Sequence, residues 1–163
     1  MLKEVLFSSK SEEWETPLDL FSVLDGEYHF TLDPCATEKN AKVKKYFTKQ
    51  TDGLAQNWQG NRVFCNPPYG KKIGDWVKKC YDESRKPNTT VVLLIPARTD
   101  TAYFHDYILG KSDIYFLRGR LHFGNSKNGA PFPSIICVFS QKVRKMIRFE
   151  TTYAGVFGLN INK

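Results

Sequence analysis

The sequence contains no apolar run that approaches the roughly 20 residues a membrane-spanning helix needs. Its start, residues 1–5, also lacks the long apolar core of a secretory signal. Internal repeats, low-complexity segments and linkers are missing as well. A chain of 163 residues suits one domain with a real core and leaves little room for a second. We therefore expect a loose segment over residues 1–13 and a single domain over residues 14–163.

Metal-binding and disulfide patterns are also missing. The cysteines are widely scattered and form no Cys-x-x-Cys pair: Cys35, Cys65, Cys80 and Cys137. Neither a zinc site nor a disulfide framework is therefore expected, and the four residues are interpreted as small buried hydrophobes in a reducing cytoplasm. His105 and His122 have no partner pattern of cysteine or carboxylate, so we assign them to no metal and no catalytic triad.

Acidic residues are fewer than basic ones, and the net charge of +7 favours a polyanionic partner. Basic residues cluster at positions 39–49, at 71–72 and 78–79, and at 142–148. For the first and last clusters, a solvated face is as good an interpretation as a binding surface. Lys71 and Lys72 immediately follow the most informative motif of the chain, and we interpret them as phosphate contacts.

That motif is Asn66-Pro67-Pro68-Tyr69, which follows an apolar segment and precedes Gly70. Two adjacent prolines fit neither a helix nor a central strand, so the motif is predicted to be a stiff turn at a strand end. The turn would hold one amide and one aromatic ring at a fixed separation. The Asn66 carboxamide oxygen and the Pro67 carbonyl could accept the two hydrogens of an amino group, while the Tyr69 ring stacks on its plane. A plain strand-to-helix turn is the structural alternative.

The apolar pattern predicts an α/β fold with a mostly parallel sheet. One helix is expected to begin at Thr16 and Pro17, with Thr16 as its N-cap. Another carries an apolar stripe at residues 73, 76, 77, 80 and 81, and a third covers 101–109. Strands are expected at 28–32, 62–65, 91–95, 114–117 and 134–139. Asp33 and Asn66 each follow a strand, so both should lie at the carboxyl edge where such sheets bind ligands.

Several segments match a known family in the order in which they occur. They are Trp14–Pro17, Leu32–Ala36, Asp52–Ala55, Asn66–Gly70, Pro96–Thr101 and Arg118–Phe123. Together they resemble the phage-type DNA N-6-adenine-methyltransferase (Dam-like) family. The resemblance implies a compact Rossmann-like methyltransferase sheet, mostly parallel with an antiparallel edge and flanked by helices. It further implies double-stranded DNA as partner, a monomer or weak dimer, and the cytoplasm of a bacterial host cell.

The resemblance also implies S-adenosylmethionine as cofactor. Asp33, within the segment Asp33-Pro34-Cys35-Ala36, would accept hydrogens from the cofactor ammonium group. Trp14, Thr16 and Pro17 resemble an element whose helix N-terminus holds the methionine carboxylate, and Asp52 resembles one that bonds the adenine amino group. Each has a structural alternative, namely a turn aspartate, a capped helix start and an Asp-Gly turn. No Gly-x-Gly follows Asp33, and no carboxylate for the ribose is identifiable.

For the reaction, the resemblance implies catalysis by Asn66, Pro67, Pro68 and Tyr69 on an adenine flipped out of the duplex. Phe123 would form the opposite face of a sandwich around the base. Further DNA contacts are expected from the following residues: Lys71, Lys72, Arg98, Arg118, Arg120, Lys127 and Asn128. A hairpin with solvated arginines is an equally good interpretation of residues 118–123.

Other functions remain open at the level of sequence. The chain could be a DNA-binding protein on a methyltransferase fold that has lost catalysis, although the intact Asn66–Tyr69 motif and Asp33 argue against this. It could also methylate RNA, the N4 atom of cytosine, or a protein glutamine. The basic charge and the absence of Gly-x-Gly disfavour the glutamine alternative.

Overall fold

The computed structural model describes residues 13–142 and 147–150. Helices and strands alternate along most of this range, as the sequence pattern predicts. The elements are α1 (Leu18–Tyr28), β1 (Arg62–Cys65), α2 (Ile73–Ser84), β2 (Thr90–Pro96), η1 (Phe104–Ile108, a π-helical turn), β3 (Asp113–Leu117), β4 (Ser134–Phe139) and β5 (Ile147–Glu150). The expected loose segment 1–13 lies outside the described residues except for Glu13, as do residues 143–146 of the last basic cluster. None of the helices in the described ranges is long and apolar enough to cross a bilayer.

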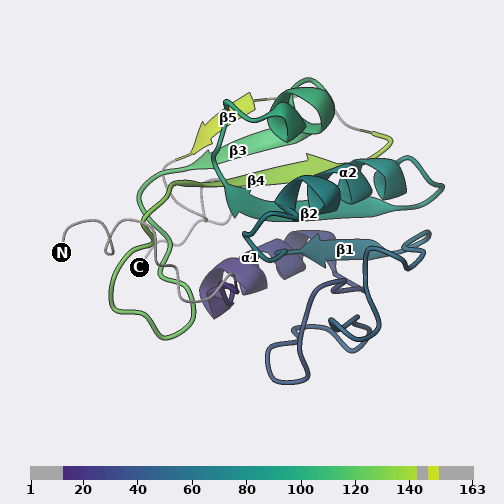
Figure 1. Ribbon diagram of the computed structural model, residues 1–163, viewed down its shortest axis with the longest axis horizontal. Helices are drawn as coiled ribbons and strands as arrows, with labels where there is room; N and C mark the ends of the chain where they lie inside the picture. Colours follow the sequence, from purple (N-terminus) through teal and green to yellow (C-terminus); the bar gives the residue numbers. More distant parts are fainter. Residues whose placement is uncertain (1–12, 143–146, 151–163) are drawn as a thin grey trace.

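The strands form one five-stranded mixed sheet in the order β1-β2-β4-β3-β5 (Figure 1). β1 pairs with β2, and β3 with β5, in parallel, whereas β4 runs antiparallel to both of its neighbours. Four of the five strands run in the same direction, so the expectation of a mostly parallel sheet is confirmed, but the expected antiparallel edge is wrong, because the antiparallel strand β4 lies in the middle. The connections explain the difference. Helix α2 crosses over between β1 and β2, but a loop without a helix joins β3 to β4 and reverses the chain.

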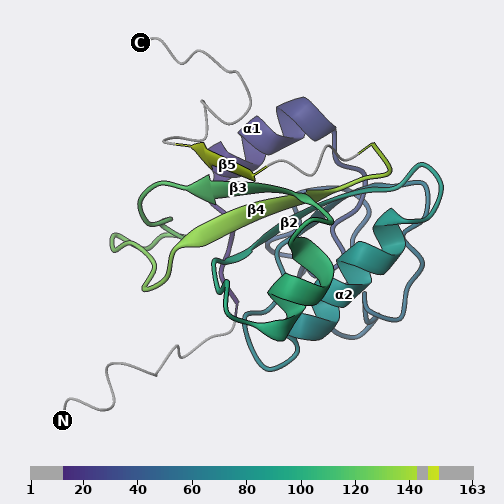
Figure 2. The same cartoon turned by 90° about the horizontal axis from the view of Figure 1, so that it is seen from above.

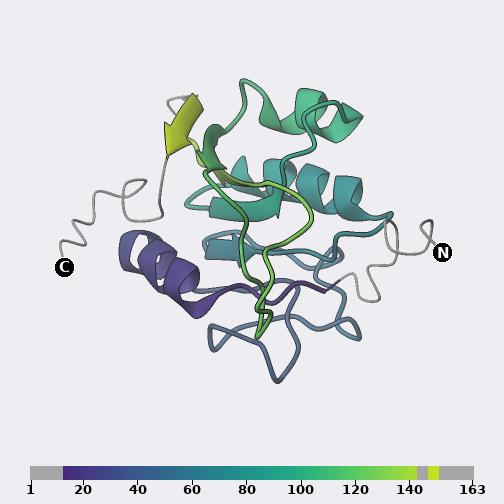
Figure 3. The same cartoon turned by 90° about the vertical axis from the view of Figure 1, so that its left-hand side faces the viewer.

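The two long helices lie on opposite faces of this sheet (Figures 2 and 3). Strand β2 is buried along residues 91–96, as expected for a strand covered on both sides. The predicted stripe of α2 is confirmed, since Ile73, Trp76, Val77 and Cys80 are buried. On the other face, Phe21 of α1 packs edge-on against Phe64 of β1 at 5.2 Å.

The beginning of the domain differs from the sequence prediction. The expected strand at 28–32 is absent because α1 continues to Tyr28 and ends at His29, which adopts a left-handed conformation with φ 51°. Only Leu32 and Asp33 then form isolated parallel bridges, to Val63 and Tyr46 respectively. Residues 36–46, whose composition permits a helix, form turns instead.

The helix start at Thr16 and Pro17 also differs in detail. Helix α1 begins at Leu18 with Pro17 as its N-cap residue, and no side chain caps it. Thr16 is buried, and its hydroxyl oxygen accepts a hydrogen bond from the side chain of Asn66 instead of capping the helix. Leu18, expected on the buried side, is 70% exposed. The predicted helix at 101–109 is shorter than expected and is mostly the π-helical turn η1.

Glu83 is the one buried carboxylate of α2 and ties three parts of the domain together. Its side chain is 3% exposed and pairs with Lys79 at 2.6 Å and Lys86 at 2.8 Å. It also accepts the backbone N–H of the fully buried Trp58 at 2.9 Å. Burial alone would raise the pKa of this carboxyl group, but these three hydrogen bonds outweigh it and lower the pKa.

We predict that Glu83→Gln lowers the free energy of unfolding at pH 7 by about 2 kcal/mol, because it weakens the charge-assisted hydrogen bonds from the partly buried Lys79 and from Lys86, whose side chain is 38% exposed. Since the folded-state pKa lies below 4.5, the stabilising effect of Glu83 is present above that pH and is lost as the pH falls through the folded pKa. Urea unfolding at pH 7 and pH 3 measures both effects. Asp82→Asn is the control, because Asp82 forms an exposed pair with Lys78 on the same helix. Equal losses in the two variants would contradict the prediction.

Candidate functional site

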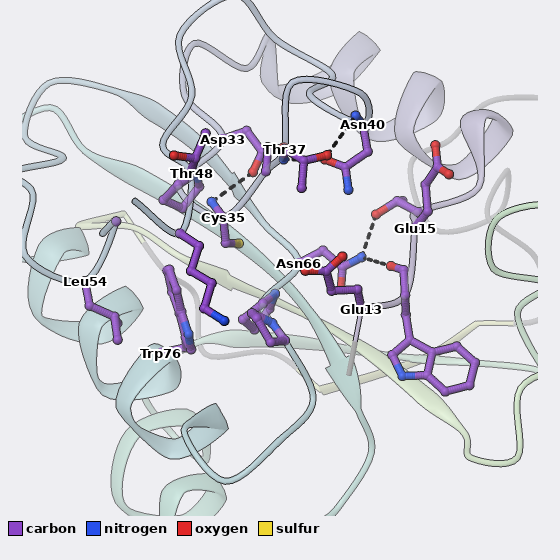
Figure 4. Close-up of a pocket in the computed structure, with 18 of the residues that line it drawn as sticks. Glu13, Glu15, Asp33, Cys35, Thr37, Asn40, Thr48, Leu54, Asn66 and Trp76 are labelled. Atoms are coloured by element: carbon purple, nitrogen blue, oxygen red, sulfur yellow. Dashed lines mark hydrogen bonds between the residues drawn. The ribbon is translucent and has the colours of Figure 1, made fainter. Parts of the chain in front are cut away.

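Motifs that are far apart in the sequence meet at a cavity of about 860 Å³ beyond the carboxyl end of β1 (Figure 4). Most of its walls come from four segments, namely residues 13–16 before α1, 33–37 after Leu32, 48–54, and 66–68 with 70–72 after β1, and further lining comes from Asn40, Lys42, Phe64 and Trp76. Asp33 and Asn66 both line it, so their expected placement at one edge of the sheet is confirmed. Trp14, Thr16, Pro34, Cys35, Ala36 and Asp52 line it as well. Of the expected cofactor residues, only Pro17 does not.

Asn66 is held in one orientation by the segment that precedes α1. Its Nδ2 donates to the carbonyl oxygen of Trp14 at 2.6 Å and to Oγ1 of Thr16 at 2.8 Å. A peptide carbonyl can only accept a hydrogen bond, so the NH2 group must face Trp14 and the oxygen must face the other way. Asn66 Oδ1 accepts the hydroxyl hydrogen of Tyr69 at 2.7 Å. The side chain is therefore arranged to accept a hydrogen bond on that side.

Tyr69 is buried in an aromatic cluster and does not line the cavity. Its hydroxyl lies 2.7 Å from Asn66 Oδ1 and 3.3 Å from the carbonyl oxygen of Leu94. Burial raises the pKa of the phenol well above its usual value, which keeps the hydroxyl a neutral donor. The ring lies nearly parallel to Trp14, with centroids 6.5 Å apart and planes at 20°. Phe123 and Phe132 contact it edge-on, at 84° and 79°.

This arrangement differs from the expected sandwich. The sequence interpretation placed Phe123 face to face across the base from Tyr69, but the ring parallel to Tyr69 is Trp14. Trp14 thus takes part in two features. It lines the cavity, and it forms an aromatic cluster with Tyr69, Phe123 and Phe132. The loop 118–133 reaches this cluster and is fastened there by a bond from Gly124 N–H to the Glu15 carbonyl at 2.8 Å.

Asp33 supplies a buried carboxylate to the cavity. It is 6% exposed, and its Oδ1 accepts the Cys35 N–H at 3.2 Å. Burial raises the pKa of Asp33 to about 6, although this hydrogen bond and the charge of Lys42 act in the opposite direction. Lys42 itself pairs with Glu15 at 3.2 Å. A cationic group entering the cavity would therefore find a carboxylate whose charge is only partly compensated.

The turn at Asp52 and Gly53 packs tightly against the Asp33 segment. A Cβ atom at position 53 would lie 1.9 Å from the Pro34 carbonyl oxygen, so only glycine fits. The Gly53 carbonyl accepts the indole N–H of Trp58 at 2.9 Å.

Sequence reasoning missed Trp76, which lines the cavity but was interpreted as core from its helical stripe. Its position on the first turn of the helix after the motif was the available signal.

The thiols near the site are free. Cys35 lies two residues after the bridge at Asp33, and Cys65 is the last residue of β1; their sulfur atoms are 3.8 Å apart. Burial raises the pKa of both thiols, so they are neutral and poorly reactive. Within residues 13–142 and 147–150, no grouping of three cysteine, histidine or carboxylate side chains could hold a metal ion.

The expected DNA-binding residues occupy three places. Lys71 and Lys72 are exposed and line the cavity. Arg118, Arg120, Lys127 and Asn128 are exposed on the loop that ends in the aromatic cluster, and Arg98 is exposed just after β2. Of the expected nucleic-acid contacts, only Phe123 is buried.

The sequence matches one protein family along most of its length. The model of the DNA N-6-adenine-methyltransferase (Dam) family matches residues 4–151. The chain is 31% identical over 132 residues to the DNA N-6-adenine-methyltransferase of Haemophilus phage HP1, covering 79% of this chain and 76% of that protein. It is also 31% identical over 110 residues to the DNA N-6-adenine-methyltransferase of Escherichia phage T1, covering 66% of this chain and 45% of that protein.

Among solved structures, a predicted O-methyltransferase from Agrobacterium tumefaciens matches with a TM-score of 0.44 and 12% identity, over 75% of this chain and 78% of that one. A likeness at that TM-score does not by itself establish a shared fold. The family match covers most of the chain, and the resemblance inferred from the sequence is confirmed: the chain belongs to the DNA N-6-adenine-methyltransferase family.

We predict that Asp33→Asn stabilises the ligand-free protein at neutral pH. Because the folded-state pKa is raised from 3.8 to about 6, the native state binds more protons in this interval, and stability falls as the pH rises through it. Asparagine avoids this cost and can still accept the Cys35 N–H. The variant should match wild type near pH 4 and exceed it by roughly 2–3 kcal/mol at pH 7.5 in urea unfolding.

The matched control for this prediction is Asp52→Asn. The carboxylate of Asp52 also accepts an N–H two residues on, from Leu54 at 3.2 Å, but Asp52 is exposed. Its replacement should change stability little at either pH. A stability difference for Asp33→Asn that does not depend on pH would contradict the explanation from burial.

Proposed function

We propose that the cavity beside Asn66 is the active site, and that it transfers a methyl group from S-adenosylmethionine to the N6 amino group of adenine in DNA. The observation that carries the proposal is the orientation of Asn66. Its NH2 group is fixed by Trp14 and Thr16, so its oxygen is left to accept a hydrogen bond. An exocyclic amino group is a donor of the kind this oxygen requires.

The residues around the cavity fit the cofactor. Its α-ammonium group would be held by Asp33, whose buried carboxylate has a raised pKa and gains from a cationic partner. Leu54 and Trp76 supply an apolar wall suited to the adenosine portion. When bound, the cofactor supplies an electrophilic methyl group on a sulfonium sulfur.

The chain's own contribution is to orient and activate the amino nitrogen. The N6 lone pair is conjugated into the adenine ring, which makes it a poor nucleophile. Acceptance of its two hydrogens by Asn66 Oδ1 and the Pro67 carbonyl would favour a tetrahedral nitrogen and stabilise its developing positive charge. An amide is not a base, so Asn66 would orient the amino group, and the positively charged nitrogen that results from methyl transfer would lose its proton to water.

The substrate must replace contacts that the ligand-free site makes with itself. Asn66 Oδ1 bonds the Tyr69 hydroxyl, and that hydroxyl has the Leu94 carbonyl as a second acceptor at 3.3 Å. A shift of the hydroxyl toward Leu94 would free Oδ1 for the adenine amino group. The base also needs an aromatic face. Because Trp14 and Phe132 cover the Tyr69 ring, one of these side chains would have to move when the flipped base enters.

DNA would approach across the rim formed by Lys71 and Lys72 and the loop 118–133. The arginines, Lys127 and Asn128 of that loop are exposed, and they would contact bases or phosphates next to the flipped adenine. We propose that this loop supplies the sequence preference, because its polar side chains are exposed.

The decisive experiment is transfer of labelled methyl from S-adenosylmethionine to unmethylated duplex DNA, followed by nucleoside analysis. Labelled N6-methyladenine is expected. Asn66→Ala should lower turnover at least a hundredfold, because the amino group loses its oriented acceptor. Cofactor binding, followed by calorimetry, should change little.

Asn61→Ala is the matched control, since Asn61 also donates to a backbone carbonyl, that of Trp58 at 3.1 Å, at the far end of β1. It should leave turnover near the wild-type value. Label found in another nucleoside, or an Asn66→Ala enzyme as active as wild type, would overturn the proposed chemistry.

Lys71 and Lys72 give a separate prediction. If both contact phosphates, Lys71→Ala and Lys72→Ala should each weaken binding to all DNA sequences by a similar factor. Each should also reduce the slope of log affinity against log salt by about 0.9. Fluorescence anisotropy at several salt concentrations measures both quantities. Lys111→Ala is the control, because Lys111 is exposed outside this rim and lies over the Tyr81 ring. An unchanged slope would exclude phosphate contacts by these lysines.

A further inference from the structure

Thr16 has an unusual place for a residue that precedes a helix. It is 5% exposed, lines the cavity, and does not cap α1. Its hydroxyl oxygen instead accepts the Nδ2 hydrogen of Asn66 at 2.8 Å, across 50 residues of sequence. The hydroxyl is thus directed at the amide that the proposed reaction depends on.

The amide plane of an asparagine is set by its surroundings. The terminal torsion of this side chain is broad and has no strongly preferred value, so hydrogen bonds decide the orientation. One N–H of Asn66 goes to the Trp14 carbonyl and the other to the Thr16 hydroxyl. With a single anchor the group could still turn about that bond. With two anchors the plane is fixed, and so is the direction in which Oδ1 points.

The hydroxyl hydrogen of Thr16 has no acceptor among the described residues. The one hydrogen bond that this hydroxyl makes with them is the one its oxygen accepts from Asn66 Nδ2. A hydroxyl can accept and donate at the same time. Since Thr16 lines the cavity, its hydrogen is available to an acceptor oxygen of a bound ligand. A ligand that takes this hydrogen would also strengthen the bond from Asn66, because linked hydrogen bonds polarise one another.

We propose that Thr16 is a positioning residue, whose hydroxyl fixes the Asn66 amide plane and so aims Oδ1 at the amino group of the substrate. The proposal rests on the function assigned to Asn66 above. It differs from a purely structural role at a helix start, in which the hydroxyl would matter for stability alone. It also differs from simple ligand binding, which would change affinity and leave turnover of the bound complex intact.

The test compares Thr16→Val, which keeps the shape but removes the hydroxyl, with Thr16→Ser, which restores it. Thr16→Ala removes the hydroxyl together with the γ-methyl group. The matched control is Thr89→Val, because Thr89 is 3% exposed and its hydroxyl also accepts an N–H, that of Gly60 at 2.9 Å. Thr89 precedes β2, at the end of the sheet away from the cavity.

Steady-state kinetics with DNA give the first readout. Thr16→Val and Thr16→Ala should lower kcat by roughly 10- to 100-fold, as expected for a misaligned reacting group, while KM for DNA changes less than about threefold. Thr16→Ser should recover most of kcat, and Thr89→Val should leave it unchanged despite a similar loss of thermal stability. The proposal is overturned if Thr16→Val retains wild-type kcat, or if Thr16→Ser is as impaired as Thr16→Val.

The second readout does not depend on any reaction. In 15N-labelled protein, the side-chain NH2 signals of Asn66 can be assigned by their absence in Asn66→Ala. Their exchange with solvent should be roughly tenfold faster in Thr16→Val than in wild type, from the loss of one hydrogen bond, and near the wild-type rate in Thr16→Ser and Thr89→Val. Equal exchange in wild type and Thr16→Val would refute the positioning role. Faster exchange combined with no methyl transfer by the wild type would instead reject the proposed function alone.

Discussion

The two hydrogen bonds from the Asn66 amide to residues 14 and 16 are the contacts on which the site depends. They join the segment before α1 to the end of β1 and thereby close one wall of the cavity. The adjacent prolines stiffen the turn that follows, so the amide is held from both sides. If these bonds were absent, Asn66 would keep its position in the chain but lose its defined direction. A correct motif is therefore not sufficient, because the partner segment has to be in place as well.

Asp33 shows how such a site conflicts with stability. A buried carboxylate whose pKa rises to about 6 disfavours the folded state at neutral pH. Among the described residues, one N–H and the charge of Lys42 are what offset this cost. Glu83 is also buried but has two lysines and a backbone N–H as partners, and its pKa falls. Both are buried acids of one small domain. The difference is that the protein itself supplies the partners of Glu83, whereas we propose that Asp33 takes its cationic partner from the cofactor.

Much of this was predictable from the sequence, for identifiable reasons. The strands 62–65 and 134–139 and the stripe of α2 were placed correctly, because local apolar periodicity matched the burial that the fold imposes. The meeting of Asp33 and Asn66 followed from the rule on strand ends. The middle position of the antiparallel strand was not predictable, because strand order depends on long-range pairing. The parallel packing of Trp14 on Tyr69 was missed for the same reason, since these residues lie far apart in the chain.

The shortened start of the sheet has a consequence for the site. Where a full strand was expected, only Leu32 and Asp33 pair with their neighbours, and the segment 33–36 is held mainly by bonds to residues 45–47. Asp33 is thus positioned by a loop-to-loop contact and by the close fit of Gly53 against Pro34. Asn66, in contrast, is positioned by a buried strand. The half of the cavity proposed to orient the substrate is therefore anchored to the sheet as well as to residues 14 and 16, while the half proposed to hold the cofactor depends on loop packing. Turnover should accordingly tolerate loop substitutions better than any change that lets the Asn66 amide turn.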